Sequence, residues 1–301
     1  MASTSTSTGS ITPVIASQPQ AAPAPPARGR GLNLPLVMGS VIVVFFAACA
    51  LLPGVIAPGD PLKLNVAAQF APPGAAHLMG TDQVGRDLWT RIVHATRYSL
   101  GTAMAIVIVG AAIGTVYGAI AGYVGETVDE VMMRIVDVFL SLPGFILAMA
   151  VAASIGRGLG PLIAALVIVW WPSYARLVRS MVLGLKERPH VEGARSLGAT
   201  APYIMRRHIM PLMIDQLNVR ITQDLGYALV AVSSLSFIGL GVQPPTPEWG
   251  VLLSDARAYI SSSWWYPLFP GLAIALATVG FAMLGDGLSQ LRNSGRRQFR
   301  Q

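Results

Sequence analysis

The chain has 301 residues, of which 53% are hydrophobic and only 12% are charged, and its formal net charge is +7. Its mean hydropathy is +0.58. These values differ strongly from those of an average soluble domain and predict an integral membrane protein. The basic residues are not interleaved with aromatic residues as a nucleic-acid surface requires, so we expect no nucleic acid among the partners.

Several apolar stretches are long enough to cross a bilayer, because a spanning helix needs about 20 mostly apolar residues. Residues 1–33 precede these stretches and are rich in Ser, Thr, Ala, Pro and Gly. This composition predicts a disordered tail. The glycine-rich stretch 156–160 predicts a tight helical hairpin between two of the spans. We predict an all-α, polytopic membrane protein with six transmembrane helices, at residues 34–56, 100–124, 135–155, 159–177, 212–240 and 267–288.

The first apolar stretch has a second interpretation as a secretory signal peptide. This alternative is disfavoured because the stretch continues past Cys49 to Ile56, which is longer than a signal core, and because further apolar stretches follow. A single cysteine also excludes an internal disulfide bond and a cysteine-cluster metal site.

The distribution of Lys and Arg predicts the orientation in the membrane, since cytoplasmic segments keep an excess of positive charge. Most of the 21 basic residues fall on one side if both termini are cytoplasmic. We therefore expect a multi-pass protein of the plasma membrane with both termini in the cytoplasm.

Charged residues inside the predicted spans are energetically unfavourable in hydrocarbon and need a charged partner or water. Arg134 and Asp137 are three residues apart, and Arg220 and Asp224 are four apart, so each pair can lie on one helix face. We expect each pair to be an ion pair within its own helix, and we favour this over a role in translocation.

Motifs for chemistry are absent from the sequence. It contains no G-x-x-x-x-G-K-[ST] loop, no H-E-x-x-H and no G-x-S-x-G. The four histidines are scattered over different segments, which disfavours a metal site. We expect no catalytic residues, no metal and no cofactor bound by this chain.

One glycine pattern predicts close helix packing. Gly110, Gly114, Gly118 and Gly122 recur every four residues in the second predicted span. Such a small face lets another helix approach closely. It occurs in many membrane bundles and therefore says little about function.

The segment 186–211 interrupts two apolar stretches with charged and small residues, which indicates a surface outside the membrane. A short, slim helix is expected from Glu192, followed by a reversal at Gly198, because glycine adopts the left-handed conformation cheaply. Such a helix could enter a cleft in a partner, or it could lie on the membrane surface as an amphipathic loop. The spacing alone does not decide between these alternatives.

A resemblance favours the first alternative. The letters EGARSLG at residues 192–198, followed by HIMP at residues 208–211, resemble the coupling loop of ATP-binding-cassette importer permeases. The family has Ala where this chain has Gly193, Ile where it has His208, and Leu where it has Met210. The resemblance implies an ATPase-coupling loop that includes Glu192, Gly193, Ala194, Arg195, Gly198, Ala199, His208 and Pro211.

A second block resembles the segment that precedes the core helices in dipeptide and oligopeptide permeases of the C type. Further matches continue through residues 35–292. Val232 departs from the pattern, because relatives often carry Glu there, and Leu212 stands where Asn is usual. The pre-core motif consists of Gly80, Thr81, Asp82, Gly85, Arg86, Asp87 and Arg97.

The resemblance implies a type I importer permease fold with a cytoplasmic coupling helix. Residues 34–99 would hold the first transmembrane helix and an extracytoplasmic segment, 100–291 the core permease domain, and 292–301 a cytoplasmic tail. The implied partners are a homologous second permease, cytoplasmic ATPase subunits that bind ATP and Mg, an extracytoplasmic substrate-binding protein and the lipid bilayer.

Peptides are the expected cargo of such a permease, and a nickel chelate or glutathione is the alternative. A secondary transporter is a further alternative, disfavoured because few ionisable residues lie in the spans and no inverted repeat is evident. The Pro-rich loop 243–247 and Trp249 could contact a binding protein, but we expect them to cap helix ends.

Overall fold

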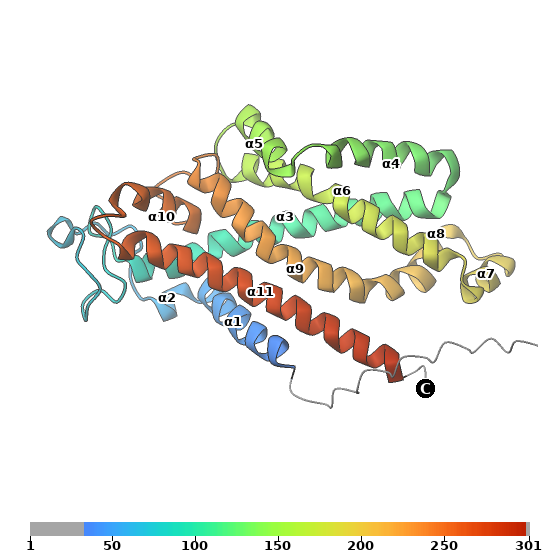
Figure 1. Ribbon diagram of the computed structural model, residues 1–301, viewed down its shortest axis with the longest axis horizontal. Helices are drawn as coiled ribbons and strands as arrows, with labels where there is room; N and C mark the ends of the chain where they lie inside the picture. The colour runs from blue at the N-terminus through green and yellow to red at the C-terminus, as the bar shows by residue number, and fades with distance from the viewer. Residues whose placement is uncertain (1–32, 299–301) are drawn as a thin grey trace, which may run out of the picture. The chain divides into compact units, whose positions relative to one another are not determined.

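The computed structural model describes residues 33–298, and for residues 292–298 it describes the backbone only. The predictions made for residues 1–32 and 299–301 lie outside the described residues. The described chain is helical, with a single isolated β-bridge between Thr81 and Asp87 (Figure 1). The α-helices are α1 (Leu34–Leu51), α2 (Pro53–Ile56), α3 (Leu88–Val124), α4 (Glu126–Ser141), α5 (Gly144–Ile155), α6 (Leu159–Lys186), α7 (Pro189–Ser196), α8 (Ala201–Ile204), α9 (Met210–Phe237), α10 (Trp249–Ala256) and α11 (Trp265–Gln298).

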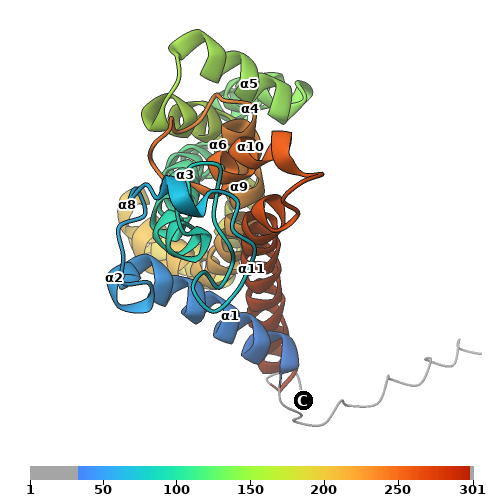
Figure 2. The ribbon, with the colours of Figure 1, turned by 90° about the vertical axis from the view of Figure 1, so that its left-hand side faces the viewer.

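Short turns of other helix types complete the structure. Val66–Ala68 and Arg257–Tyr259 are 3-10 helices, and Met205–Ile209 is a π-helical turn between α8 and α9. Figure 2 looks onto the end of the helices that carries α2, α10 and the long segment between α2 and α3. The opposite end of α6 and α9 carries α7 and α8 (Figure 1).

The structure supports most of the predicted spans. In the described residues, α1, α3, α6 and α11 are long and apolar enough to cross a membrane, and the bent pair α4 and α5 brings the number to five. The remaining predicted span, 212–240, corresponds to α9, which has 28 residues but carries Asp215, Arg220 and Asp224. The count of six spans therefore remains a prediction.

The third predicted span, 135–155, is not one continuous helix. It breaks between α4 and α5, and the two helices meet at 89°. Leu142 is extended, with φ −90° and ψ 142°, and Pro143 follows it. A proline disfavours the helical conformation of the residue before it, which explains the break at this position.

The predicted hairpin between α5 and α6 is present. Gly156 and Gly158 form the turn, with φ of 124° and 129°. Ala148 on α5 packs with Leu162 and Leu166 on α6 in one buried cluster. The hairpin therefore holds α5 against α6.

The long helix α3 lies against α6 along the glycine face that the sequence singles out. A Cβ atom at Gly114 would lie 2.4 Å from the carbonyl oxygen of Trp171, and one at Gly118 would lie 2.2 Å from that of Ala175. Added Cβ atoms at Gly110 and Gly122 would also meet α6, at 3.1 Å and 3.0 Å. Because any side chain at Gly114 or Gly118 would overlap backbone atoms, these positions set the distance between the two helices.

The helices α1 and α11 pack together in a similar way. A Cβ atom at Gly39 of α1 would lie 2.4 Å from the backbone nitrogen of Leu284, and one at Gly287 of α11 would lie 2.6 Å from Leu36. The helix α11 continues to Gln298, beyond the predicted end of the last span.

Candidate functional site

The 186–211 loop is anchored on the helix bundle by a row of apolar side chains. Val191 of α7, Ile204 of α8, Ile209 and Met213 are fully buried and belong to the main hydrophobic core. Ala194 packs against the same core. Burial of these side chains fixes α7 to the ends of α6 and α9.

The other face of α7 is open. Glu192, Gly193 and Arg195 are exposed, and no heavy atom lies within 4 Å of a Cβ atom built on Gly193. Leu197, which the sequence analysis did not single out, is 90% exposed. Glu192, Arg195 and Leu197 are therefore accessible on the side of α7 that does not pack on the bundle.

The end of α7 is a tight glycine turn. The amide of Gly198 donates to the carbonyl of Arg195 at 3.0 Å, and the amide of Ala199 donates to that of Ala194 at 3.1 Å. Gly198 has φ +82°. These two bonds and the left-handed glycine form a Schellman motif, which gives the loop a defined reversal.

His208 and Pro211 lie in the helix that leaves the loop. The ring of His208 is partly buried and lies 5.8 Å from the ring of Tyr203 and 6.2 Å from that of His190. The π turn ends at Ile209, two residues before Pro211, and the amide of Met210 donates to the carbonyl of Met205. Proline clashes with the carbonyl four residues earlier in a regular α-helix, so the wider turn accommodates it. The chain is thus helical without interruption from Ala201 to Phe237.

Two contacts connect the loop to the end of α3. Lys186 donates from Nζ to the carbonyl of Gly122 at 3.0 Å. The guanidinium of Arg195 lies 6.0 Å from the centre of the Tyr123 ring, within the range of a cation–π interaction.

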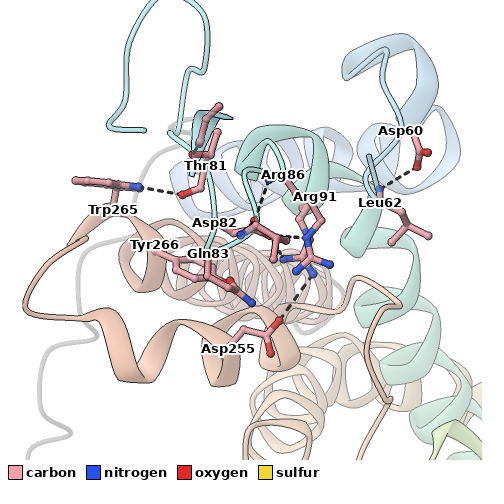
Figure 3. Close-up of polar contacts among 12 residues, drawn as sticks. Asp60, Leu62, Thr81, Asp82, Gln83, Arg86, Arg91, Asp255, Trp265 and Tyr266 are labelled. Carbon is pink, nitrogen blue, oxygen red and sulfur yellow. Dashed lines mark hydrogen bonds and ion pairs between the residues drawn. The ribbon is translucent and has the colours of Figure 1, made fainter. Parts of the chain in front are cut away.

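The pre-core motif lies at the opposite end of α3 and is built around a buried carboxylate (Figure 3). Asp82 is fully buried and accepts hydrogen bonds of 2.6 Å from Nε of Arg86 and from Nη1 of Arg91. The amides of Val84 and Arg86 donate to its other oxygen, at 3.0 and 2.9 Å. Charged groups buried in this manner need such partners, so the cluster fixes the segment on α3.

The cluster extends to α10 and α11. Nη2 of Arg91 lies 3.9 Å from Oδ2 of Asp255 in α10. Burial raises the pKa of Asp255, against the opposing charges of Arg91 and Arg86. From α11, Trp265 donates to the carbonyl of Thr81 at 3.3 Å, and the Tyr266 hydroxyl donates to Gln83 (Figure 3).

Other residues of the pre-core motif determine the local backbone conformation. Gly80 and Gly85 both have φ +75°. Asp87 caps α3 by accepting from the amide of Thr90 at 2.9 Å, and its other oxygen lies 2.9 Å from Nδ1 of His77. Arg97 is exposed and lies outside this cluster.

Glu248 is a buried carboxylate that the sequence analysis missed. It caps α10 by accepting from the amide of Val251 at 3.1 Å, and it also accepts from the hydroxyl of Ser99 on α3 at 3.0 Å. Trp249 is fully buried and donates to the carbonyl of Ile92 at 3.1 Å. Trp249 is therefore part of the core, and the residue that caps α10 is Glu248; a capping role of the Pro-rich loop 243–247 stays a prediction.

Of the two ion pairs expected within single helices, the structure contains one. Arg220 and Asp224 pair at 3.0 Å. The pairing of Arg134 with Asp137 is wrong, because Asp137 pairs instead with Arg176 of α6 at 2.5 Å. The reason is geometric: α4 lies beside α6, which offers an arginine that sequence spacing cannot reveal.

No group of three or more His, Cys, Asp or Glu side chains comes together in residues 33–291 in a way that could hold a metal ion. The exposed face of α7 is therefore a surface that a partner protein can contact, whereas the buried cluster around Asp82 fixes the segment at the opposite end of α3.

Comparison with known proteins defines the class. The family model described as "Binding-protein-dependent transport system inner membrane component" matches residues 114–298, which is more than half of the chain. The chain belongs to this family and is a multi-pass membrane component of a transport system. The predicted resemblance to importer permeases is confirmed.

Relatives narrow the class further. The chain is 36% identical over 255 residues to the "Probable D,D-dipeptide transport system permease protein DdpC" of Escherichia coli strain K12, covering 85% of this chain and 86% of the relative. It is 43% identical over 216 residues to the "Glutathione transport system permease protein GsiD" of Pectobacterium atrosepticum, covering 72% of each. It is also 38% identical over 251 residues to the "Nickel transport system permease protein NikC" of Escherichia coli strain K12, covering 82% of this chain and 90% of the relative.

Proposed function

We propose that this chain is a permease subunit of an ATP-driven importer and forms half of the translocation pathway for dipeptides or oligopeptides. The observation that carries the proposal is the anchored helix α7 with its open face. Val191 is fully buried on one side, whereas Glu192, Gly193 and Leu197 face outward on the other. A helix held firmly on one side and open on the other can be seated in a partner and can transmit its displacement.

The partner at α7 is a cytoplasmic ATPase subunit, which binds ATP and Mg. The coupling residues are those of the α7 turn, with His208 and Pro211 in the helix that follows. This chain supplies no catalytic residue, since its part in the cycle is to move when the ATPases close. Both termini then lie in the cytoplasm.

At the opposite end, the extracytoplasmic partner is a substrate-binding protein. The buried cluster around Asp82 makes that end rigid, because two buried arginines and the contacts with α10 and α11 hold its segments together. A homologous second permease completes the pathway. We place it beside α9, where a mid-helix cluster of polar residues would be unfavourable in lipid.

Peptides are the proposed cargo because the DdpC relative is named for a dipeptide system. The relatives named for glutathione and nickel support the alternative of another small solute. A secondary transporter is a weaker candidate, since α7 would then have no partner to cover its open face.

The test is substrate-stimulated ATP hydrolysis and uptake by the complete complex reconstituted in vesicles. Glu192→Arg reverses a charge on the open face of α7, and we expect it to abolish stimulation while the subunits still assemble. Glu130→Arg makes the same change at an exposed position of α4 and serves as the control. Full stimulation in the Glu192→Arg complex would show that α7 is only a surface connector.

A further inference from the structure

A depression on the face shared by α6 and α9 lies far from both ends of these helices. Its volume is about 230 Å³. It combines aromatic, hydroxyl and charged side chains, which is unusual for a helix surface in a membrane. The lining residues are Val169, Trp170 and Ser173 of α6 and Arg220, Asp224 and Tyr227 of α9.

The depression lies close to the middle of α9. Arg220 is about 15 Å along the helix from Met210, and Asp224 is about 20 Å from Phe237, at roughly 1.5 Å per residue. Asp215 and Asn218 are also exposed on this helix. Ionisable residues at such depth face protein or a water-filled cavity rather than lipid. The depression therefore opens toward the interior of the assembled transporter.

The charged pair in the depression is unequally exposed. Asp224 is 2% exposed, whereas 47% of the Arg220 side chain is accessible. Arg220 uses Nε to donate to Asp224 at 3.0 Å. A guanidinium has five N–H donors, so the four on its terminal nitrogens are not used by this bond. The ion pair therefore holds Arg220 in place without exhausting its capacity to bind an anion.

We propose that Arg220 binds the terminal carboxylate of a peptide as it passes through the membrane, in a subsite that Asp224, Trp170 and Tyr227 complete. This inference rests on the proposed function. Arginine recognises carboxylates with two parallel hydrogen bonds, which gives the site directional selectivity. A terminal carboxylate is shared by all free peptides, so the subsite needs no contact with a particular side chain.

The surroundings of Arg220 keep this binding weak. Asp224 offsets much of the positive charge, so the subsite attracts a carboxylate without trapping it. The hydroxyl of Ser173 donates to the carbonyl of Trp170 at 2.9 Å, and its oxygen remains able to accept from a peptide N–H. Transport requires a site that cargo can leave as well as enter.

The experiment measures uptake of Ala-Ala and of its C-terminal amide by the complete complex in vesicles, and takes the ratio of the two rates. The double variant Arg220→Gln, Asp224→Asn replaces the ion pair by two amides, so that no buried carboxylate is left unpaired. The binding protein also discriminates between the peptide and its amide, but it is the same protein in the wild-type and variant complexes. Its contribution therefore cancels when the two ratios are compared. We expect the preference for the free acid to fall roughly three- to tenfold.

Two further variants make the result decisive. Arg220→Lys keeps the positive charge but loses the planar guanidinium that donates two parallel hydrogen bonds, so we expect a smaller fall in the same ratio. Arg134→Gln removes an exposed arginine of α4 and should leave the ratio unchanged. If the double variant does not assemble, Arg220→Lys carries the test. An unchanged ratio in the assembled Arg220 variants would overturn the subsite and leave the proposed function standing. Absence of ATP-driven uptake of Ala-Ala and of longer peptides by the wild-type complex would instead overturn the proposed function and the subsite with it.

Discussion

Asp129 of α4 accepts two hydrogen bonds from Arg179 of α6, from Nε at 2.5 Å and from Nη2 at 2.6 Å. Fifty residues separate them in the sequence. These two bonds hold α4 beside α6. The bend at Pro143 separates α4 from α5. Because α5 also packs on α6, the two arms of the bent segment are attached to the same helix.

The Asp129 pair should matter more than the neighbouring pair of Asp137 with Arg176. Asp129 is buried and forms two hydrogen bonds, whereas Asp137 and Arg176 are both more than half exposed. We expect Asp129→Asn to lower the free energy of unfolding by about 1–2 kcal/mol and Asp137→Asn by less than about 0.5 kcal/mol. Unfolding of each purified variant in mixed micelles measures the difference. Equal losses would contradict the ranking.

The carboxylate of Asp82 should be essential to the end of α3 where it lies. Asp82→Asn removes the charge that faces Arg91, which is 1% exposed. Arg91 then keeps only the longer ion pair with Asp255, at 3.9 Å, and breaking a buried ion pair costs up to about 3–5 kcal/mol, so we expect a lower unfolding temperature. Asp60→Asn is the control, because Asp60 is exposed and lies in the same segment between α2 and α3. The prediction fails if both variants unfold at the wild-type temperature.

A methyl group on the glycine face of α3 should separate it from α6. At Gly118 the added carbon would lie 2.2 Å from the carbonyl oxygen of Ala175, whereas at Gly101 of the same helix it would meet no atom within 4 Å. We expect Gly118→Ala to destabilise the protein by about 1–3 kcal/mol and Gly101→Ala to leave it unchanged or slightly more stable. Denaturant unfolding of both variants checks this. Similar values at the two positions would refute it.

The two glycines of the α7 turn should respond in opposite directions. Gly193 is helical and has open space around it, so alanine there should stabilise the helix by up to about 1 kcal/mol. Gly198 has φ +82°, where alanine costs about 1–2 kcal/mol. Amide hydrogen exchange of peptides covering residues 189–199 should slow in Gly193→Ala and accelerate in Gly198→Ala. A change of the same sign in both would show that backbone preference does not govern this turn.

Glu248 should make stability depend on pH. Burial raises its pKa above the ordinary value of 4.5, although hydrogen bonds from the amides of Gly250 and Val251 oppose the shift. The folded protein then holds this proton more tightly than the unfolded chain, so stability is lost as pH rises from 4.5 through the raised pKa. Glu248→Gln should remove this loss.

The measurement for Glu248 is the unfolding temperature of wild type and Glu248→Gln between pH 4.5 and pH 8. We expect the wild type to lose stability relative to the variant as pH rises. Glu187→Gln, at an exposed position, controls for the removal of one negative charge. A constant difference between wild type and Glu248→Gln across this range would count against the buried carboxylate as the cause.

Features with a local physical cause could be predicted from the sequence. The four-residue spacing of glycines indicated a close helix contact on α3, and Gly198 indicated a reversal after α7. Both depend on properties of glycine that hold wherever it stands. The partner of the glycine face, α6, could not be predicted, because periodicity describes one helix at a time.

Features that depend on distant residues were missed or wrong. The ion pair of Asp137 with Arg176 joins two helices, and spacing within α4 suggested Arg134 instead. Glu248 had a local signal, since it stands directly before α10 in a cap position, but only the structure shows Ser99 beside it. The break at Leu142 was also readable from Pro143, yet the apolar composition on both sides favoured one straight span.

The uninterrupted helix from Ala201 to Phe237 acts as a lever with one arm in the α7 region and the other beyond Arg220. It is roughly 55 Å long at about 1.5 Å per residue, so a tilt of about 5° about a pivot near Arg220 moves each end by about 2 Å, in opposite directions. A displacement of α7 would therefore reach the far end of α9 with about the same amplitude, without any change in the helix itself.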